Sequence, residues 1–121
     1  MSHDVKTADQ VTGYHAHVYF DEASEATAAA LRQDVETRFD VTMGRWHHKP
    51  VGPHPAWSYQ IAFGPDHFAE LVPFLALNRR DLSILVHPMT GDVVADHLDY
   101  ALWLGERLSL DPAPLRSAAE G

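Results

Sequence analysis

The sequence contains no cysteine. Disulfides, thiolate nucleophiles, iron–sulfur clusters and cysteine-type zinc sites are therefore excluded, and any metal ion must be held by nitrogen and oxygen ligands. A long hydrophobic run is also absent, because no segment approaches the roughly 20 apolar residues that cross a bilayer. We therefore expect no membrane partner.

Positive charge is scarce as well. Nine Lys and Arg residues stand against 17 Asp and Glu residues, which gives a formal net charge of −8. A protein that binds the nucleic-acid backbone needs a positively charged face, so nucleic acid is not an expected partner. Histidine, in contrast, is abundant, with nine in 121 residues. A cluster of these imidazoles would be a candidate metal or acid–base site.

The chain length supports one domain, because 121 residues fill a single two-layer core and are too few for two cores. We expect a disordered or frayed lead-in over residues 1–12, a single domain over residues 13–110 and a loose tail over residues 111–121. The lead-in has no apolar segment of the signal-peptide type. We therefore expect a cytoplasmic protein.

The spacing of apolar residues predicts the secondary structure. Alternation with period 2 predicts strands at residues 13–20, 41–47, 56–63 and 81–87, and helical spacing predicts helices at about residues 22–38, 66–78 and 92–108. The resulting order β-α-β-β-α-β-α is that of a ferredoxin-like βαββαβ sandwich with an additional C-terminal helix, which is an α+β fold.

One face of the expected sheet gathers polar side chains. In a ferredoxin-like fold both helices cover the same face, and the first strand lies between the third and the fourth. The alternation places His15 and His17 on the face away from the helices. The phases of the neighbouring strands place Ser58, Gln60 and His87 on that same face. We therefore expect these side chains to lie close together.

This grouping suits a metal ion. Two imidazoles two positions apart on a strand point the same way, with Cβ atoms roughly 6–7 Å apart, so both can reach one ion. A third ligand from the adjacent strand completes the set, which predicts a metal site at His15, His17 and His87. Zinc, copper and non-heme Fe(II) all accept such ligands. The same histidines could instead be half-exposed surface residues.

The next histidines lie in the segment that follows the second predicted strand. His47 and His48 are neighbours that face oppositely on a strand, so at most one of them can share the site, and we favour a substrate role for His48. Together with Arg45 and Lys49 they could also form an anion-binding edge. His54 lies between two prolines, as either a rigidly presented acid or base or a simple turn residue.

His97 lies beside Asp96 in the last predicted helix. A neighbouring carboxylate could raise the pKa of this histidine or hydrogen-bond to a metal ligand. We therefore regard Asp96 and His97 as residues that could assist the metal site. A boundary position on an amphipathic helix is the alternative reading of His97.

Four segments together resemble one family: GYHAHVYFD, GRWHHKPVGPHPAWSYQIAF, FLALNRRDLSILVHP and DHLDYALWLGERL. They resemble the DOPA 4,5-dioxygenase family of small extradiol-type ring-cleaving dioxygenases, from about residue 13 to residue 110. The resemblance implies a ferredoxin-like fold, an Fe(II) cofactor, and O₂-dependent opening of the ring of DOPA or a related catechol. It also implies functional roles for His15, His17, His48, His54 and His87.

Under this resemblance each residue has an expected role. His15, His17 and His87 hold the metal, and His54 or His48 handles protons. The residues expected to bind substrate are Arg45 or Lys49 for a carboxylate, Trp46, Trp57 or Tyr59 as walls for the ring, and Gln60. Iron is the expected metal, although a crystal could hold zinc in its place.

One departure from many extradiol enzymes is the missing carboxylate ligand. Such enzymes often use two histidines and one carboxylate, yet the polar face of the predicted strands carries no Asp or Glu. Either three histidines form the site, or Asp96 or Glu25 supplies the carboxylate.

Two other classes of protein would show the same histidines. One is a dimeric small-molecule or metal-binding protein without oxygenase activity, and the other is a zinc-dependent hydrolase. We also expect a homodimer, formed through the open sheet face and the apolar last helix. The apolar residues of that helix are Tyr100, Leu102, Trp103 and Leu104.

Overall fold

The structure, a computed structural model, describes residues 4–120. Nine helices and strands in this part of the chain build the fold: β1 (Gly13–Phe20), α1 (Glu25–Arg38), β2 (Thr42–Met43), β3 (Trp57–Phe63), α2 (Phe68–Asn78), β4 (Ser83–Met89), α3 (Val93–His97), β5 (Leu102–Leu104) and α4 (Pro112–Glu120). Two short 3₁₀ helices, η1 (Ala8–Gln10) and η2 (Pro65–His67), precede β1 and α2.

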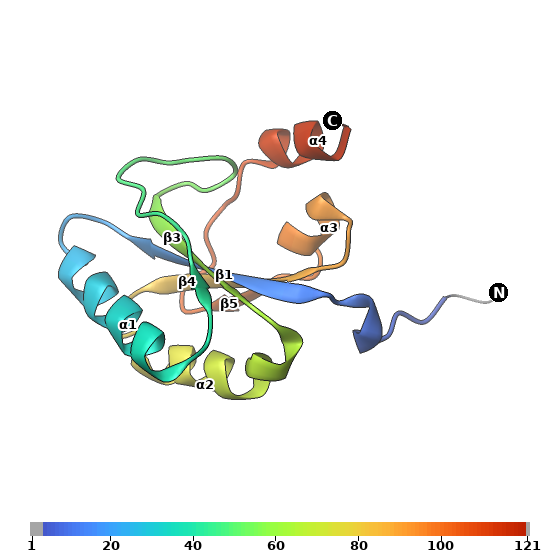
Figure 1. Cartoon of the computed structure of the whole chain (residues 1–121). Helices are drawn as coiled ribbons and strands as arrows, with labels where there is room; N and C mark the ends of the chain where they lie inside the picture. The colour runs from blue at the N-terminus through green and yellow to red at the C-terminus, as the bar shows by residue number, and fades with distance from the viewer. Residues whose placement is uncertain (1–3, 121) are drawn as a thin grey trace.

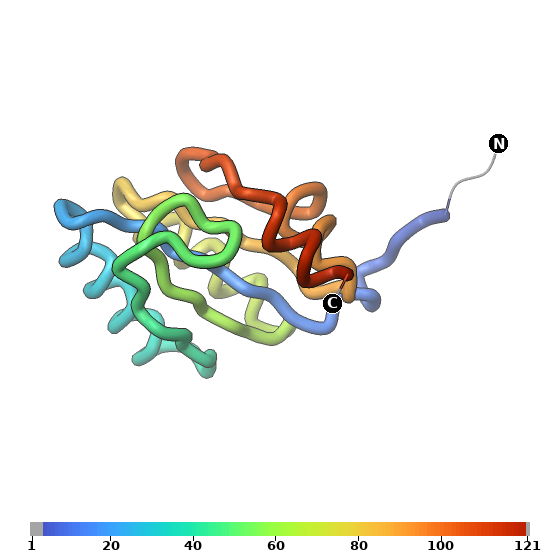
Figure 2. Tube along the Cα trace, turned by 90° about the horizontal axis from the view of Figure 1, so that it is seen from above, coloured from blue at the N-terminus to red at the C-terminus, as the bar shows by residue number. Residues whose placement is uncertain are grey.

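The five strands form one antiparallel sheet in the order β2-β3-β1-β4-β5. The central position of β1 between β3 and β4 is as predicted. Helices α1 and α2 cover one face of the sheet, while α3, α4 and the loop between β2 and β3 lie over the other (Figures 1 and 2). The predicted α+β, ferredoxin-like fold is therefore confirmed.

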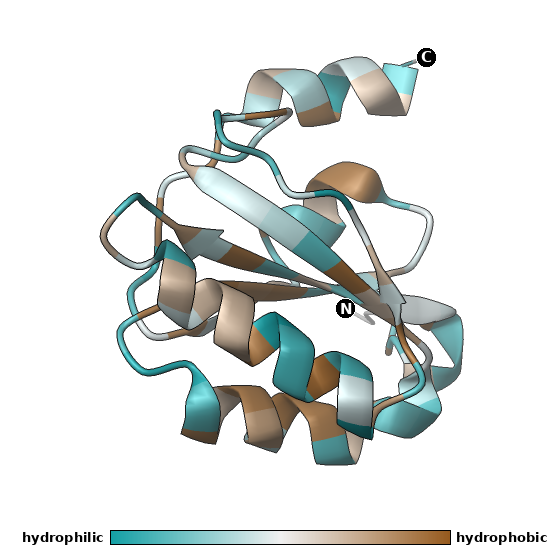
Figure 3. Cartoon of the chain, turned by 60° about the vertical axis from the view of Figure 1, so that its left-hand side comes forward, coloured by the Kyte–Doolittle hydropathy of each residue, from teal (hydrophilic) through white to brown (hydrophobic). Residues whose placement is uncertain are grey.

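The core lies between the sheet and the helices α1 and α2. Alternate residues of the three inner strands point toward the helices, and Figure 3 shows both hydrophilic and hydrophobic residues along the sheet. Residues of this core that are entirely buried include Ala16, Val18, Tyr59, Ile61, Ile84 and Val86 from the strands and Val35, Leu71 and Leu75 from the helices. Burying one such Val, Leu or Ile side chain contributes about 1.5–3 kcal/mol, so this layer supplies most of the folding free energy.

The C-terminal third differs from the prediction. The helix predicted for residues 92–108 is wrong: α3 ends at His97, and Leu102–Leu104 form β5 on the free edge of β4. The open ladder of β4 gives these backbone groups partners that outweigh the helical spacing of the leucines. The predicted homodimer therefore lacks the apolar helix on which it partly depended, and it stays a prediction.

The segment 111–121, predicted to be a loose tail, contains α4. The Asp111 carboxylate accepts a hydrogen bond from the Ala113 backbone N–H at 3.0 Å, and Pro112 occupies the first position of the helix. Both features favour helix initiation. Leu115 is buried at 3 % exposure, and α4 packs against α3.

Three smaller differences concern element ends. The strand predicted for residues 41–47 is reduced to β2 and an isolated bridge between His47 and Ser58. Helix α1 begins at Glu25 rather than at residue 22, because Asp21 and Ser24 hydrogen-bond each other in a turn. Of the predicted frayed lead-in, residues 1–3 lie outside the described residues, and η1 lies within the rest.

No helix in residues 4–120 is both long and apolar enough to span a membrane.

Candidate metal centre

Three histidines meet on the sheet face opposite to α1 and α2. His15 and His17 come from β1, and His87 comes from β4, where it lies directly opposite His15. One ligand atom from each histidine lies within 4.8 Å of the others. His87 is entirely buried, and His17 is 5 % exposed. The structure thus brings together the three side chains predicted to hold a metal.

The ring nitrogens of this group are arranged for a shared ion. His87 Nδ1 lies 3.0 Å from the Pro88 carbonyl oxygen. Since that oxygen can only accept, Nδ1 carries the proton and Nε2 of His87 keeps a lone pair. The Nε2 atoms of His17 and His87 are 3.1 Å apart. If two nitrogens bind one ion at about 2.1 Å and their bonds to it form a right angle, the nitrogens are about 3.0 Å apart. The observed spacing therefore fits a shared metal ion.

Burial keeps these imidazoles neutral. It lowers the pKa of His87 to about 3, although the hydrogen bond to Pro88 acts in the opposite direction. Burial also lowers the pKa of His17 well below its usual range, with further contributions from His54 and His87. The pKa of His15 is lowered by burial and by His97. A neutral imidazole is the form that binds a metal ion.

Two further histidines lie against this group. The ring of His54 lies 4.2 Å from that of His17, and the ring of His97 lies 3.9 Å from that of His87, both between centroids. Burial, followed by the effects of His97 and His47, lowers the pKa of His54 to about 4. His97 Nδ1 donates to the Val93 carbonyl at 2.8 Å. Five imidazoles therefore share one region of the sheet face.

Tyr19 and Trp103 extend this cluster, and the sequence reasoning missed both. The Tyr19 hydroxyl lies 2.6 Å from His54 Nδ1, and burial raises the pKa of this tyrosine above its usual range. Trp103 of β5 stacks on Tyr19 with ring centroids 5.9 Å apart. The alternation that selected His15 and His17 also places Tyr19 on their face, so its signal was present. Trp103 was hidden because its segment was predicted to be helical.

Besides a hollow of about 430 Å³ that reaches His15, two smaller hollows flank the other histidines. One, of about 240 Å³, is lined by His17, His47, His54 and Gln60 among others. The other, of about 310 Å³, is lined by residues of α3, β5 and the segment after β5, including His97. Each hollow thus reaches a histidine of the cluster, which gives a small molecule access to it.

His47, and not His48, faces this region. The sequence reasoning favoured His48, but its Nε2 lies 3.1 Å from a Glu25 carboxylate oxygen at the N-terminal end of α1. His48 also contacts the ring of Phe20 on the helix side of the sheet. His47 pairs with Ser58 through its backbone and lines the first hollow. The two neighbours face oppositely, as expected, and the structure places His47 rather than His48 beside the clustered histidines.

The carboxylates proposed as ligands are engaged elsewhere. Glu25 pairs with His48. Asp96, 2 % exposed, accepts hydrogen bonds from the Thr90 backbone N–H at 3.0 Å and from the Thr90 hydroxyl at 2.5 Å. It therefore braces the turn that precedes α3. Among the described residues, the group that could hold a metal consists of His15, His17 and His87 alone.

The three aromatic residues predicted to wall the substrate lie on the other face. Tyr59 is entirely buried under α1, where its hydroxyl donates to the Ala28 carbonyl at 2.8 Å. Trp46 and Trp57 pack against the same core. The physical reason is the phase of β3, because Trp57 and Tyr59 alternate with Ser58 and share the face of Ile61. The structure does not bring these rings to the histidines.

Among the polar residues predicted to bind substrate, Gln60 does reach the site. It lies opposite His17 on β3 and lines the first hollow. Arg45 and Lys49 are exposed and line neither hollow. The cation that does line one of them is Arg107, beside Trp103 and His97 in the second hollow.

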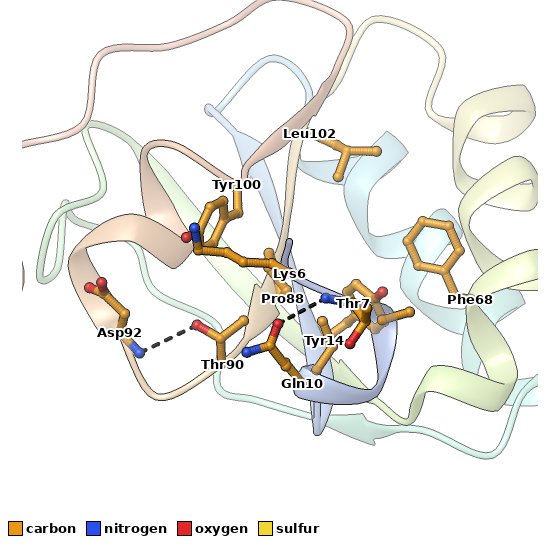
Figure 4. Close-up of a pocket in the computed structure, with 12 residues that line it drawn as sticks. Lys6, Thr7, Gln10, Tyr14, Phe68, Pro88, Thr90, Asp92, Tyr100 and Leu102 are labelled. Atoms are coloured by element: carbon orange, nitrogen blue, oxygen red, sulfur yellow. Dashed lines mark hydrogen bonds between the residues drawn. The ribbon is translucent and has the colours of Figure 1, made fainter. Parts of the chain in front are cut away.

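A further hollow, of about 470 Å³, lies at the other end of β1 (Figure 4). Tyr14, Phe68 and Tyr100 contribute its aromatic lining. Polar groups in it are used locally: the Gln10 side-chain oxygen accepts from the Thr7 backbone N–H at 2.9 Å, for example. None of the clustered histidines lines it, so the candidate site remains the histidine face.

Comparisons with known proteins point to one family. The sequence profile of the Dopa 4,5-dioxygenase family matches residues 14–113. A protein of Amanita muscaria named DOPA 4,5-dioxygenase is 35% identical over 115 residues, which are 88% of this chain and 50% of that protein. An uncharacterized 21.2 kDa protein of Botryotinia fuckeliana is 32% identical over 110 residues, which are 81% of this chain and 60% of that protein. This chain thus spans about half of the first curated relative and three fifths of the second.

A solved structure agrees with these matches. The crystal structure of a candidate dioxygenase from Nostoc punctiforme PCC 73102 is 51% identical in sequence, with a TM-score of 0.93. The match covers 94% of this chain and 99% of that one. At this identity the likeness extends beyond the fold, and together with the profile match it shows that the chain belongs to the Dopa 4,5-dioxygenase family.

Proposed function

We propose that the chain is an extradiol dioxygenase that opens the ring of DOPA or a related catechol with O₂. The observation that carries this proposal is the buried group of His15, His17 and His87, with His54 and His97 packed against it. Family membership supports the dioxygenase class. The extradiol position of ring opening and the choice of catechol are parts of the proposal.

Fe(II) is the metal that we propose for the three histidines. Three neutral imidazoles on one side of an ion leave its remaining positions open for small molecules. When bound, Fe(II) would supply the redox chemistry that allows O₂ to react with a catechol. Zinc accepts the same ligands, so the donor set alone does not choose between the two metals.

The chain's own residues supply the proton transfers. Ring opening needs one group that takes a proton from the substrate hydroxyl and later returns it, and a second group that donates a hydrogen bond to the substrate. In His97, Nδ1 donates to the Val93 carbonyl, so Nε2 is an acceptor in the neutral ring. His54, predicted to handle protons, is the hydrogen-bond donor of this proposal, and its ring lies beside that of His17.

The second hollow supplies contacts for the rest of the substrate. Trp103 offers an aromatic surface beside His97, and Arg107 offers a cation for a carboxylate such as that of an amino-acid side group. These two residues take the roles that the sequence reasoning gave to Trp46, Trp57 or Tyr59 and to Arg45 or Lys49.

The test is anaerobic loading of the protein with Fe(II), followed by DOPA and air. We expect a yellow ring-fission product whose mass shows the addition of both oxygen atoms. His17→Ala and His87→Ala should abolish it, because each removes one of three ligands. His67→Ala is the matched control, since His67 lies in η2 at the start of α2 and should retain activity.

Two results would contradict the proposal. One is iron bound at the site without product from any of a panel of catechols, which would favour a metal-binding protein without oxygenase activity. The other is product formation that survives both His17→Ala and His87→Ala. Hydrolysis of an ester panel by the zinc-loaded protein would point to the zinc hydrolase instead.

A further inference from the structure

The contact between Tyr19 and His54 joins the sheet to the loop above it. Tyr19 is the last residue but one of β1, and it shares the face of His15 and His17. His54 comes from the loop between β2 and β3. The Tyr19 hydroxyl and His54 Nδ1 are 2.6 Å apart, which is a short hydrogen bond between a buried tyrosine and a half-buried histidine.

The surroundings of the pair decide which group donates. Tyr19 is 3 % exposed, and within residues 4–120 its hydroxyl has no other hydrogen-bond partner. If Nδ1 of His54 donated, the hydroxyl proton would be buried without an acceptor, which is costly. If the hydroxyl donates, both groups are satisfied. Nδ1 of His54 is then the acceptor, so the proton of the neutral ring lies on Nε2.

Several contacts hold the two rings in place. Trp103 stacks on Tyr19 with an angle of 20° between the ring planes. The His54 backbone N–H donates to the Val51 carbonyl at 3.0 Å. The Pro53 carbonyl accepts a hydrogen bond from the Asp111 backbone N–H at 2.9 Å, which ties the loop to the segment before α4. The loop therefore presents His54 from an anchored backbone.

The two histidines beside the metal group then carry opposite tautomers. His97 donates through Nδ1 to a backbone carbonyl and keeps its lone pair on Nε2. His54 accepts at Nδ1 and carries its proton on Nε2, and its ring lines the hollow that also contains His17. Among the described residues, Nε2 of His54 has no hydrogen-bond partner, so its N–H can donate a hydrogen bond to a bound molecule.

We infer that Tyr19 is a positioning residue that fixes the neutral ring of His54 with its Nε2–H as a hydrogen-bond donor toward the site, while His97 serves as the proton acceptor. The catalytic consequence rests on the proposed dioxygenase function, but the tautomer assignment does not. Tyr19 acts through His54 and touches neither substrate nor metal in this role.

Tyr19→Phe tests the inference, because it removes only the hydroxyl. Nitrogen chemical shifts of the His54 ring, measured by NMR on the full chain with and without bound zinc, distinguish a protonated from an unprotonated nitrogen. We expect Nδ1 unprotonated and Nε2 protonated in the wild-type chain, and a mixture of tautomers in Tyr19→Phe. With Fe(II), kcat for ring cleavage should fall by about tenfold or more with KM unchanged. Removing a hydrogen-bond donor that faces developing negative charge typically costs about 100-fold to 1,000-fold, and in Tyr19→Phe His54 itself remains.

Tyr59→Phe is the matched control. It removes another buried tyrosine hydroxyl, one that donates to the Ala28 carbonyl on the opposite face of the sheet. It should lower thermal stability at least as much as Tyr19→Phe and leave both the His54 tautomer and kcat unchanged. In a His54→Ala background, Tyr19→Phe should cause no further loss of kcat, because its effect passes through His54.

The outcomes separate this inference from the proposed function. Unchanged His54 nitrogen shifts in Tyr19→Phe, or an equal loss of kcat in the His54→Ala background, would overturn the inference while the dioxygenase proposal stands. If the wild-type chain cleaves no catechol, the dioxygenase proposal fails, and the NMR comparison still decides whether Tyr19 sets the tautomer of His54.

Discussion

The two faces of the central sheet use alternate residues of the same strands, yet they bury different kinds of side chain. The face toward α1 and α2 buries aliphatic and aromatic residues. The other face, under α3, α4 and the loop between β2 and β3 (Figure 1), buries His17 and His87 together with Tyr19 and Leu85. Burying a neutral imidazole gains less free energy than burying an apolar side chain of similar size. The first face therefore contributes most of the folding free energy. The second face contributes less, because it buries imidazoles that can serve as metal ligands.

The segments that cover the two faces of the sheet also differ. Helices α1 and α2 are 14 and 11 residues long and carry leucines and valines at helical spacing, with Pro73 inside α2. The other face is covered by a proline-containing loop, a five-residue helix and a terminal helix. Segments of this kind leave small hollows beside the histidines. A regular helix packed on that face would fill the space that a substrate needs.

The largest expected effect separates the two faces at adjacent positions of β1. His17→Ala should abolish metal binding and ring cleavage, because it removes one of three ligands. Val18→Ala, one residue away on the core side, should lower the free energy of unfolding by about 2 kcal/mol and retain metal binding. Metal titration and urea unfolding of both variants measure these effects.

The stability of His17→Ala sharpens this comparison. Without metal, it should be destabilised less than Val18→Ala, since removing a buried imidazole also removes the cost of desolvating it. A larger loss of unfolding free energy in His17→Ala, or a loss of metal binding in folded Val18→Ala, would contradict the division between the two faces.

The sequence predicted the helix-covered half of the fold well, for a local reason. Alternation in β1, β3 and β4 and helical spacing in α1 and α2 are strong over seven or more residues. The leucines after residue 97 also fit a helix, and what decides their structure is the free edge of β4, about 20 residues earlier in the chain. Contacts between distant segments are not visible in local periodicity.

In the candidate site, too, local periodicity predicted some residues, whereas others depend on contacts between distant segments. His15, His17 and His87 could be predicted because each lies on a strand whose phase the sequence reveals. The choice between His47 and His48 depends on the path of a loop, which no periodicity describes. Trp57 and Tyr59 show a different kind of error. Their strand phase places them on the apolar face, where their aromatic rings pack in the core instead of facing a substrate.

A smaller effect is expected at the helix that covers the histidine face. Asp111→Ala removes the carboxylate that accepts a hydrogen bond from the Ala113 backbone N–H at the start of α4. Loss of such a cap costs about 1 kcal/mol. Amide hydrogen exchange in α4 should therefore be faster in the variant than in the wild-type chain, whereas exchange in β1 should change less. Asp111→Asn, whose side chain can still cap the helix, is the control, and equal exchange rates in the two variants would show that capping is not the cause.

The smallest effect is expected at His48. Its side chain is 52% exposed and contacts Glu25 on the side of the sheet away from the metal group. An exposed pair of this kind contributes about 0–1 kcal/mol. His48→Ala should therefore change both the free energy of unfolding and kcat little, whereas His47→Ala alters the wall of a hollow beside His17 and His54 and should raise KM. Steady-state kinetics of the two variants decide between these neighbours. A loss of kcat in His48→Ala that exceeds the effect of His47→Ala would mean that the site extends around the edge of the sheet, and that its two faces are not functionally separate.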